Sequence, residues 1–266
     1  MFKISCIQLR SSNNIKDNLK KTTNLIIKAI NKKTDFIITP EASSIISENK
    51  SQLLSQITTM EKDVYCLGIK EIAKKYKKWI LIGSLITINK KKKIVNRSIL
   101  INPKGKVVKY YDKIHMYDVK LSNKEKYSES KIYKAGNKIK FYKLPWGKLG
   151  FSICYDLRFP NMYRKLSKSG SIFISVPSAF TLTTGKKHWH TLLKARAIEN
   201  FCYIFAPAQG GTHSNGRKTY GHSLIISPDG KVIKEIKSNK VGFITAEIYP
   251  EIAKKLRKSI PSLSKD

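Results

Sequence analysis

The chain has 266 residues, and its 52 Lys and Arg residues outnumber its 18 Asp and Glu residues, which gives a formal net charge of +34. Only seven of the basic residues are Arg, whereas proteins that read nucleic acids rely on Arg for base and phosphate contacts, so we expect no specific nucleic-acid partner. There is no apolar run of about 18 residues and no signal-peptide core, so we expect no membrane span and place the protein in the cytoplasm.

Strands and helices alternate along the first half of the chain. Alternating apolar residues predict a strand at 2–9, and short apolar runs predict further strands at 35–39, 79–87, 94–102 and 106–111. Apolar residues three and four apart predict helices at 18–32 and 61–76. The stretch from 114 to 139 is polar and irregular, and loops of this length inside a domain are usually functional or mobile.

The second half repeats this alternation. Strands are predicted at 148–153, 171–176, 201–206, 222–226, 231–236 and 241–247, and helices at 161–169 and 188–200. Both ends of the chain read as polar tails, and no linker or change of composition divides it. The pattern predicts one α/β domain over residues 1–266, built as a sandwich with mixed sheets.

One cysteine stands apart from the other three. Cys6, Cys66 and Cys202 lie in apolar runs and are expected to be buried, and no C-x-x-C pair indicates zinc or redox chemistry. Cys154 ends an apolar strand where the polarity changes at once, which is the position of a nucleophile at a strand end. A buried structural cysteine is the alternative interpretation.

A nucleophilic thiol needs a base and a charged partner. No histidine has the right context, since His188 and His190 lie two apart on a predicted helix and point to different faces, and no cluster of metal ligands is evident. A carboxylate and a lysine are the other solution. Glu41 follows a buried strand and Lys113 follows another, although either residue alone could be an ordinary surface charge.

Taken together, these segments resemble the nitrilase superfamily of carbon–nitrogen hydrolases. The motifs Thr39–Ala42, Tyr111–His115 and Ser152–Pro160 match in order and separation. Further similar stretches extend the resemblance over nearly the whole chain, at 177–181, 184–185, 188–189, 195–199, 208–211 and 220–223. The resemblance implies a four-layer α-β-β-α sandwich, a homodimer, and catalysis without a cofactor or a metal.

The resemblance also assigns catalytic roles. Cys154 is the nucleophile, Glu41 is the general base, and Lys113 stabilises the oxyanion together with the backbone N–H of Tyr155. A second family glutamate corresponds to Glu129, which would hold Lys113 or the substrate nitrogen. The match around Glu129 is looser because the family often has Pro where Ala135 stands, and a solvated loop acid is the alternative.

The implied reaction converts a small carboxamide to an acid and ammonia through a cysteine thioester. Residues 180–185 and 209–221 resemble the branch that hydrolyses deaminated glutathione in metabolite repair, and an ω-amidase acting on 2-oxoglutaramate is the alternative. Both substrates are anionic. The candidate substrate-binding residues are Arg158, Phe180, Thr181, Thr184 and Arg196. Arg158 and Arg196 could equally be ion-pair partners of Asp156 and Glu199.

Two interpretations from other classes remain. A basic nucleic-acid-binding protein would use the high charge, but the lysines are spread over the whole chain, and Lys, Ile and Asn share A/T-rich codons, so genome composition is a sufficient explanation. Nonspecific polyanion binding at low salt is expected in either case. A catalytically silent binding module is disfavoured by the complete triad.

Overall fold

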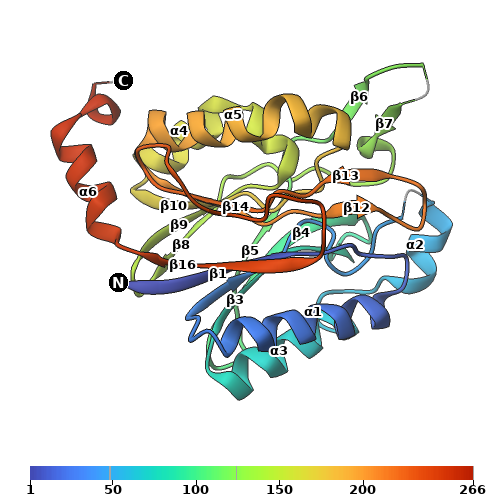
Figure 1. Ribbon diagram of the computed structural model, residues 1–266. Coiled ribbons are helices and arrows are strands. Elements are labelled where there is room, and N and C mark those ends of the chain that lie inside the picture. Colours follow the sequence, from blue (N-terminus) through green and yellow to red (C-terminus); the bar gives the residue numbers. More distant parts are fainter. Residues whose placement is uncertain (48, 124, 266) are drawn as a thin grey trace.

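The computed structural model describes residues 1–47, 49–123 and 125–265. Its framework consists of two six-stranded sheets that pack face to face (Figure 1). The first sheet has the order β16 (Gly242–Ile248), β1 (Phe2–Gln8), β2 (Phe36–Ile38), β3 (Trp79–Ile88), β4 (Ile94–Ile101), β5 (Val107–Asp112). The second has the order β15 (Val232–Glu235), β14 (Leu224–Ile226), β11 (Tyr203–Ala206), β10 (Ser171–Ser175), β9 (Gly147–Phe151), β8 (Phe141–Leu144).

Helices cover the outer face of each sheet. Helices α1 (Ile15–Ile30) and α3 (Val64–Tyr76) lie against the first sheet, and α4 (Pro160–Lys168) and α5 (Leu182–Asn200) lie against the second (Figure 1). The fold is therefore the expected four-layer α-β-β-α sandwich. No helix in the described part of the chain combines the length and the apolar character needed to cross a bilayer.

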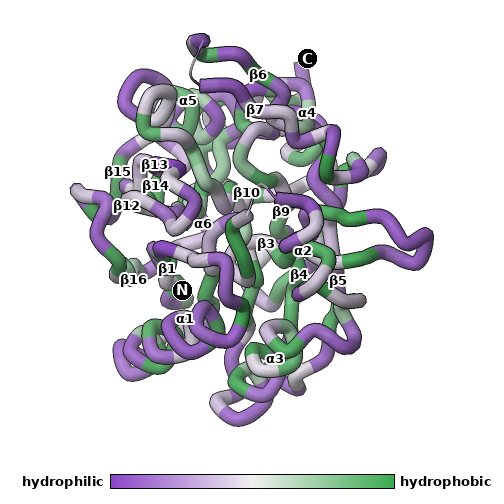
Figure 2. The backbone as a smooth tube through the Cα atoms, turned by 90° about the vertical axis from the view of Figure 1, so that its right-hand side faces the viewer, coloured by the Kyte–Doolittle hydropathy of each residue, from purple (hydrophilic) through white to green (hydrophobic). Residues whose placement is uncertain are grey.

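The central strands of each sheet, such as β2, β4, β10 and β11, are buried on both faces, which explains why they are mostly apolar, whereas the edge strands β5, β8 and β15 are partly exposed. In β1, Ile4 and Cys6 face the second sheet and join the central core, whereas Ile7 faces the helices and joins a second core. This follows from the pleat, which sends successive side chains to opposite faces. Figure 2 shows the hydrophobic segments concentrated in the interior strands and the hydrophilic ones on peripheral loops.

The C-terminal segment is not the polar tail that the sequence suggested. It forms helix α6 (Pro250–Ser259), anchored by Arg257, which donates hydrogen bonds to the backbone carbonyls of Phe201, Asn200 and Ser171. Helix α5 also begins six residues earlier than expected, because Thr181 caps its first turn by accepting from the Thr184 N–H at 3.3 Å. Capping by one side chain is a local effect that apolar periodicity does not report.

Several short elements lie in stretches expected to be loops or left unassigned. They are α2 (Lys50–Gln56), the hairpin of β6 (Asp118–Lys120) and β7 (Lys126–Ser128), the hairpin of β12 (Gly210–Thr212) and β13 (Lys218–Tyr220), and the 3₁₀ turns η1 (Glu129–Lys131), η2 (Cys154–Arg158) and η3 (Ser262–Ser264). Each is too short for its periodicity to stand out in the sequence.

In each sheet, several strands run in the same direction, so their carboxyl ends lie at the same edge of that sheet. Strands β1, β2 and β3 are parallel, and β5 runs in the same direction as β3 because two antiparallel pairings separate them. In the second sheet β9, β10 and β11 are parallel. Carboxyl ends of parallel strands meet at a common edge, which is where α/β proteins place their ligands.

Candidate active site

Cys154 sits at a sharp turn directly after β9. Its φ of 48° lies in the left-handed region, which is strained for a residue other than glycine. The turn is held on both sides: the Cys154 N–H donates to Pro177 O at 2.9 Å, and Asp156 Oδ2 accepts from the Ile153 N–H at 2.8 Å. Cys154 itself is only 6% exposed. A strained residue at a strand-to-helix turn is the geometry of a nucleophile elbow.

Glu41 follows β2 and is almost completely buried. Its Oε1 accepts from Lys113 Nζ and from Asn96 Nδ2, both at 2.9 Å, and its Oε2 accepts from the Ala179 N–H at 2.9 Å. Three donors from three segments fix the carboxylate in one orientation. Such a group is positioned to exchange a proton without first reorganising.

Lys113 follows β5 and its side chain is wholly inaccessible. Its Nζ lies between Glu41 Oε1 at 2.9 Å and Glu129 Oε2 at 2.7 Å. Glu129 belongs to η1, directly after the β6–β7 hairpin, and also accepts from the Tyr117 N–H at 2.9 Å. The structure therefore brings together the four residues to which the resemblance assigned catalysis.

The charges of these groups follow from their neighbours. Burial alone would raise the pKa of Glu41, but the Lys113 ammonium holds it below the ordinary value. Burial alone would lower the pKa of Lys113, yet Glu129 and Glu41 raise it well above the ordinary range. Burial and the adjacent Glu41 raise the pKa of Cys154 well above its ordinary value, although Lys113 opposes this. At neutral pH Cys154 is therefore a thiol, Glu41 a carboxylate and Lys113 an ammonium.

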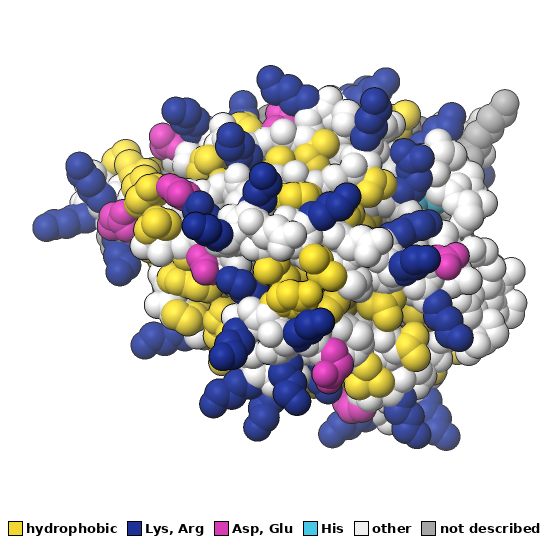
Figure 3. Space-filling view, turned by 60° about the horizontal axis from the view of Figure 1, so that its bottom comes forward, with side chains coloured by type: hydrophobic (Ala, Val, Ile, Leu, Met, Phe, Trp, Pro, Cys, Tyr) yellow, Lys and Arg dark blue, Asp and Glu magenta, His cyan; other side chains and the backbone are white. Residues whose placement is uncertain are grey.

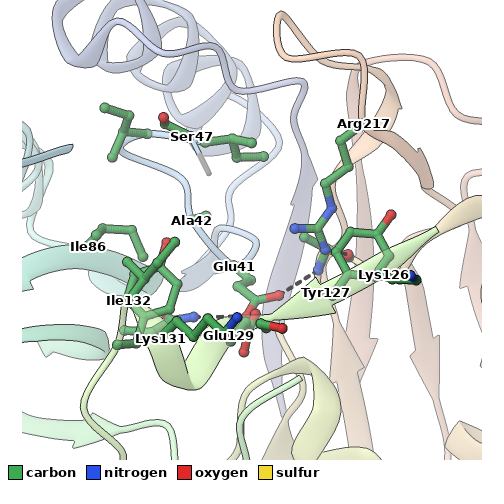
Figure 4. A pocket seen from close by; sticks show the side chains of 16 residues that line it. Glu41, Ala42, Ser47, Ile86, Lys126, Tyr127, Glu129, Lys131, Ile132 and Arg217 are labelled. Atoms are coloured by element: carbon green, nitrogen blue, oxygen red, sulfur yellow. Dashed lines mark hydrogen bonds between the residues drawn. The ribbon is translucent and has the colours of Figure 1, made fainter. Parts of the chain in front are cut away.

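Two cavities lie beside Cys154, Glu41 and Glu129, whereas Lys113 lines neither of them (Figure 4 shows the larger cavity). The smaller, of about 10 Å³, is lined by Cys154, and the larger, of about 350 Å³, is lined by Glu41. Glu129, Ala179 and Arg217 line both. The remaining residues around the smaller cavity are Tyr117, Tyr155, Phe180, Thr181 and Thr184.

The predicted substrate-binding residues fall into two groups. Phe180, Thr181 and Thr184 line the smaller cavity, and Tyr155 lies beside them. Neither Arg158 nor Arg196 lines either cavity.

The contacts of these two arginines are with the protein itself. Arg196 is buried, donates from Nε to Leu157 O at 3.0 Å, and pairs with Glu199 at 2.9 Å, as in the structural alternative. Arg158 donates to His188 Nδ1 at 3.1 Å rather than to Asp156.

Sequence reasoning missed Arg217 and Asn96. Arg217 Nη2 donates to Ala179 O at 2.9 Å. Burial would lower its pKa, but Glu41 and Glu129 raise it. Arginine is rare in this lysine-rich chain, so each arginine in the sequence could have been considered as a residue with a specific role. Asn96 interrupts the apolar strand β4, and a polar residue at such a position indicates a specific partner.

One cluster among the described residues has the composition of a metal site. His190 Nε2 and His222 Nδ1 each lie 2.9 Å from Glu235 Oε1, and the three ligand atoms are within 4.8 Å of one another. These residues line neither of the two cavities, and their polar atoms already bond to each other. The cluster therefore has no part in the chemistry at Cys154.

Comparison with known proteins gives one consistent result. The carbon–nitrogen hydrolase family model matches residues 3–258. The deaminated glutathione amidase of Synechocystis sp. is 36% identical over 263 residues, covering 97% of this chain and 96% of that protein. That of Dictyostelium discoideum is 37% identical over 261 residues, covering 96% and 90%. The solved C. elegans NitFhit protein superposes with a TM-score of 0.92 at 36% identity, and the match covers 100% of this chain and 65% of that longer one.

Proposed function

Because the chain belongs to the carbon–nitrogen hydrolase family, we propose that it is a cysteine amidase whose substrate is deaminated glutathione. The observation that carries the proposal is the buried Lys113 ammonium, held between Glu41 and Glu129. Glu129 lines the cavity that Cys154 also lines. Hydrolysis of amides is the activity of the family. The two relatives named as deaminated glutathione amidases match almost the whole chain and support this substrate.

The first half-reaction makes a thioester. Cys154 Sγ attacks the amide carbonyl while Glu41 takes the thiol proton. Lys113, with the backbone N–H of Tyr155, stabilises the negative oxygen of the tetrahedral intermediate, and one such donor is worth about 10²–10³ in rate. The carbon–nitrogen bond then breaks as Glu41 returns its proton to the leaving nitrogen.

The second half-reaction releases the acid. Glu41, again ionised, takes a proton from a water molecule that attacks the thioester carbonyl. The carbon–sulfur bond breaks, the sulfur regains a proton from Glu41, and the carboxylic acid departs. The raised pKa of Cys154 fits this cycle, because it keeps the sulfur protonated in the free enzyme. The thiol proton then moves to Glu41 only as the sulfur forms its bond to the substrate carbonyl.

The leaving group distinguishes the two candidate substrates. A primary amide such as 2-oxoglutaramate releases ammonia. In deaminated glutathione the same acyl group is bonded to the amine of cysteinylglycine, so the dipeptide leaves and not ammonia, which corrects the expected ammonia product for this substrate. An ammonia assay therefore detects only the first reaction, and the second requires detection of the dipeptide.

The test is hydrolysis of both compounds by the wild-type protein and by Cys154→Ala. We expect the wild type to release cysteinylglycine from deaminated glutathione with a higher kcat/KM than ammonia from 2-oxoglutaramate. Intact-mass spectrometry during turnover should show an acyl adduct on Cys154. The alanine variant should remain folded but lose activity by about 10⁴-fold or more. Faster turnover of 2-oxoglutaramate would favour the ω-amidase, and normal turnover by Cys154→Ala would refute the mechanism.

The nucleic-acid alternative gains no support from the surface. Figure 3 shows Lys and Arg side chains scattered over the viewed face, with acidic side chains among them rather than a separate basic stripe. A DNA mobility-shift titration at physiological salt tests this directly. Binding that persists there, with no amidase activity, would reverse the order of the two proposals.

We also propose a cytoplasmic homodimer. Four free cysteines suit a reducing compartment. Helix α6 and the residues that flank it leave Tyr249, Ile252 and Ile260 exposed at 41–51%, which offers apolar area for a second copy. Sedimentation equilibrium should give twice the chain mass of 30.4 kDa, and a single-chain mass would refute the dimer.

A further inference from the structure

Three potential metal ligands meet on the outer side of the second sheet. His190 lies on α5, His222 lies just before β14, and Glu235 ends β15. We propose that these three residues bind one divalent transition-metal ion of the zinc type, and that the ion fastens α5 to the β14–β15 hairpin. The inference is independent of the amidase function, because none of the three residues lines either cavity beside Cys154.

The three ligand atoms are already close to the separations that a bound ion requires. His190 Nε2 and His222 Nδ1 each lie 2.9 Å from Glu235 Oε1, and all three atoms lie within 4.8 Å of one another. A tetrahedral zinc ion with bonds of about 2.0–2.2 Å to nitrogen and oxygen holds its ligand atoms about 3.4 Å apart. Small rotations of the two rings therefore suffice to place an ion among the three atoms.

Neighbouring residues hold His222 in place before any ion binds. Its φ of 54° lies in the left-handed region, which is uncommon for a residue other than glycine. Its backbone oxygen accepts from Trp189 Nε1 at 2.9 Å, and its N–H donates to Ser238 O at 3.2 Å. Its ring stacks on Tyr220 with the centroids 4.2 Å apart. Because Trp189 is the neighbour of His190 on α5, the first of these bonds also fixes one histidine relative to the other. Ligands held in this way lose little conformational freedom on binding.

The donor set indicates the kind of ion. Two imidazoles and one carboxylate suit Zn²⁺ and related transition metals, whereas Ca²⁺ and Mg²⁺ prefer oxygen ligands. The side chains of His190, His222 and Glu235 are 32%, 22% and 15% exposed, so an ion can enter from solvent and keep a water molecule as its fourth ligand. The ion replaces the two hydrogen bonds to Glu235, since each neutral ring offers a lone pair once its proton moves to the other ring nitrogen.

The surrounding positive charge opposes a cation only in part. Lys186 and Lys194 lie one helical turn to either side of His190, and both are exposed. Lys234 precedes Glu235 in β15, and the pleat sends these two side chains to opposite faces. Salt at about 0.15 M screens exposed charges beyond about 8 Å. We therefore expect a dissociation constant in the micromolar range, weaker than that of a structural zinc site with four protein ligands.

Zinc titration of the full chain tests the inference. The protein is prepared without a histidine tag and with Cys154→Ala, which removes the catalytic thiol as a competing zinc ligand. Isothermal titration calorimetry at physiological salt should show one Zn²⁺ per chain, and saturating Zn²⁺ should raise the Tm by about 5 °C. In this background, His190→Gln and Glu235→Gln should each weaken zinc binding by about tenfold or more and remove most of the Tm shift.

A matched control separates the cluster from other imidazoles. His188→Gln makes the same substitution on α5, where His188 bonds to Arg158 and lies outside the cluster, and it should bind zinc like the parent protein. Circular dichroism in EDTA checks that each variant is folded. His222→Asn provides a further loss-of-ligand variant, because asparagine tolerates the left-handed conformation, and it should also weaken binding. A dissociation constant above about 1 mM for the parent protein, or zinc binding that the three ligand variants leave unchanged, would overturn the inference.

Discussion

Tyr111 Oη donates a 2.7 Å hydrogen bond to Asp156 Oδ2, and this bond joins the strand that leads to Lys113 to the turn that carries Cys154. The same carboxylate accepts from the Ile153 N–H at 2.8 Å and, through Oδ1, from the His115 N–H at 3.1 Å. Asp156 is completely buried. One carboxylate thus fixes the nucleophile relative to the ammonium, although it touches neither group.

The first prediction concerns this joint. Asp156→Asn replaces one acceptor oxygen by an NH₂ group, which would face the donors of Ile153 and Tyr111 or of His115. We expect a loss of about 2–4 kcal/mol in the free energy of unfolding and a fall in kcat larger than the rise in KM. Urea denaturation and steady-state kinetics measure the two effects. Wild-type kcat in the folded variant would show that Asp156 has no positioning role.

A second prediction concerns the buried ammonium. Lys113→Met leaves the carboxylates of Glu41 and Glu129 without their cation, which should cost about 3–5 kcal/mol of stability at neutral pH and abolish turnover. With the cation gone, burial raises the pKa of Glu41 above its unfolded value, so the variant should gain stability as the pH falls. Adding Glu129→Gln should restore part of the loss. Urea titrations at two pH values would contradict this if Lys113→Met were no more stable in acid.

Arg217 provides a third prediction. Its positive charge helps to keep the pKa of Glu41 low. Arg217→Gln should therefore raise the pKa of Glu41, and because Glu41 must be ionised in the free enzyme, the acid limb of the kcat/KM profile should move to higher pH. Arg217→Lys keeps the charge and should leave the limb near its wild-type position. If the acid limb does not shift in Arg217→Gln, then Arg217 has no effect on the pKa of Glu41.

Stability in mild acid gives a fourth prediction. His213 is buried, its Nδ1 lies 2.8 Å from Ser11 O and its Nε2 lies 2.7 Å from Thr219 Oγ1. Burial lowers its pKa to about 4, below the value of about 6.5 for an exposed histidine. Its stabilising effect is therefore complete above about pH 6.5 and is lost as the pH falls toward 4, by about 3 kcal/mol. His213→Gln should flatten this part of the stability profile, and an equal slope would contradict the assignment.

The sequence predicted most of the strands of the two main sheets and the meeting of Cys154, Glu41 and Lys113. The strands could be predicted because buried apolar runs leave local patterns, whereas the meeting of the three residues was implied by the resemblance of their motifs to the nitrilase superfamily. Glu129 was less secure, since its position depends on the short β6–β7 hairpin, which has no pattern of its own. Arg217 was missed because it reaches the site from the β12–β13 hairpin, far from any recognised motif.

The two cavities could not be predicted from the sequence either. The lining of the larger one includes Glu41, residues 126–129 and 131–133, Ala179 and Arg217, which are far apart in the chain and come together only in the folded sandwich. Similarly, whether Arg196 binds substrate or Glu199 depends on which way a long side chain turns, and its contact with Leu157 O decides that. Spacing along the chain carries no such information.

The arginines and the lysines of this protein lie in different surroundings. All seven arginines donate hydrogen bonds to defined partners, as Arg97 does in its two bonds to Asp112, whereas most of the 45 lysines lie on the exposed surface. A change of genome composition toward lysine codons can thus alter the charged residues on the surface and leave the hydrogen bonds of the arginines unchanged. It also means that chemical acetylation of the exposed lysine amines would remove most of the positive charge and yet leave Lys113 charged, because its ammonium is buried and paired with Glu41 and Glu129.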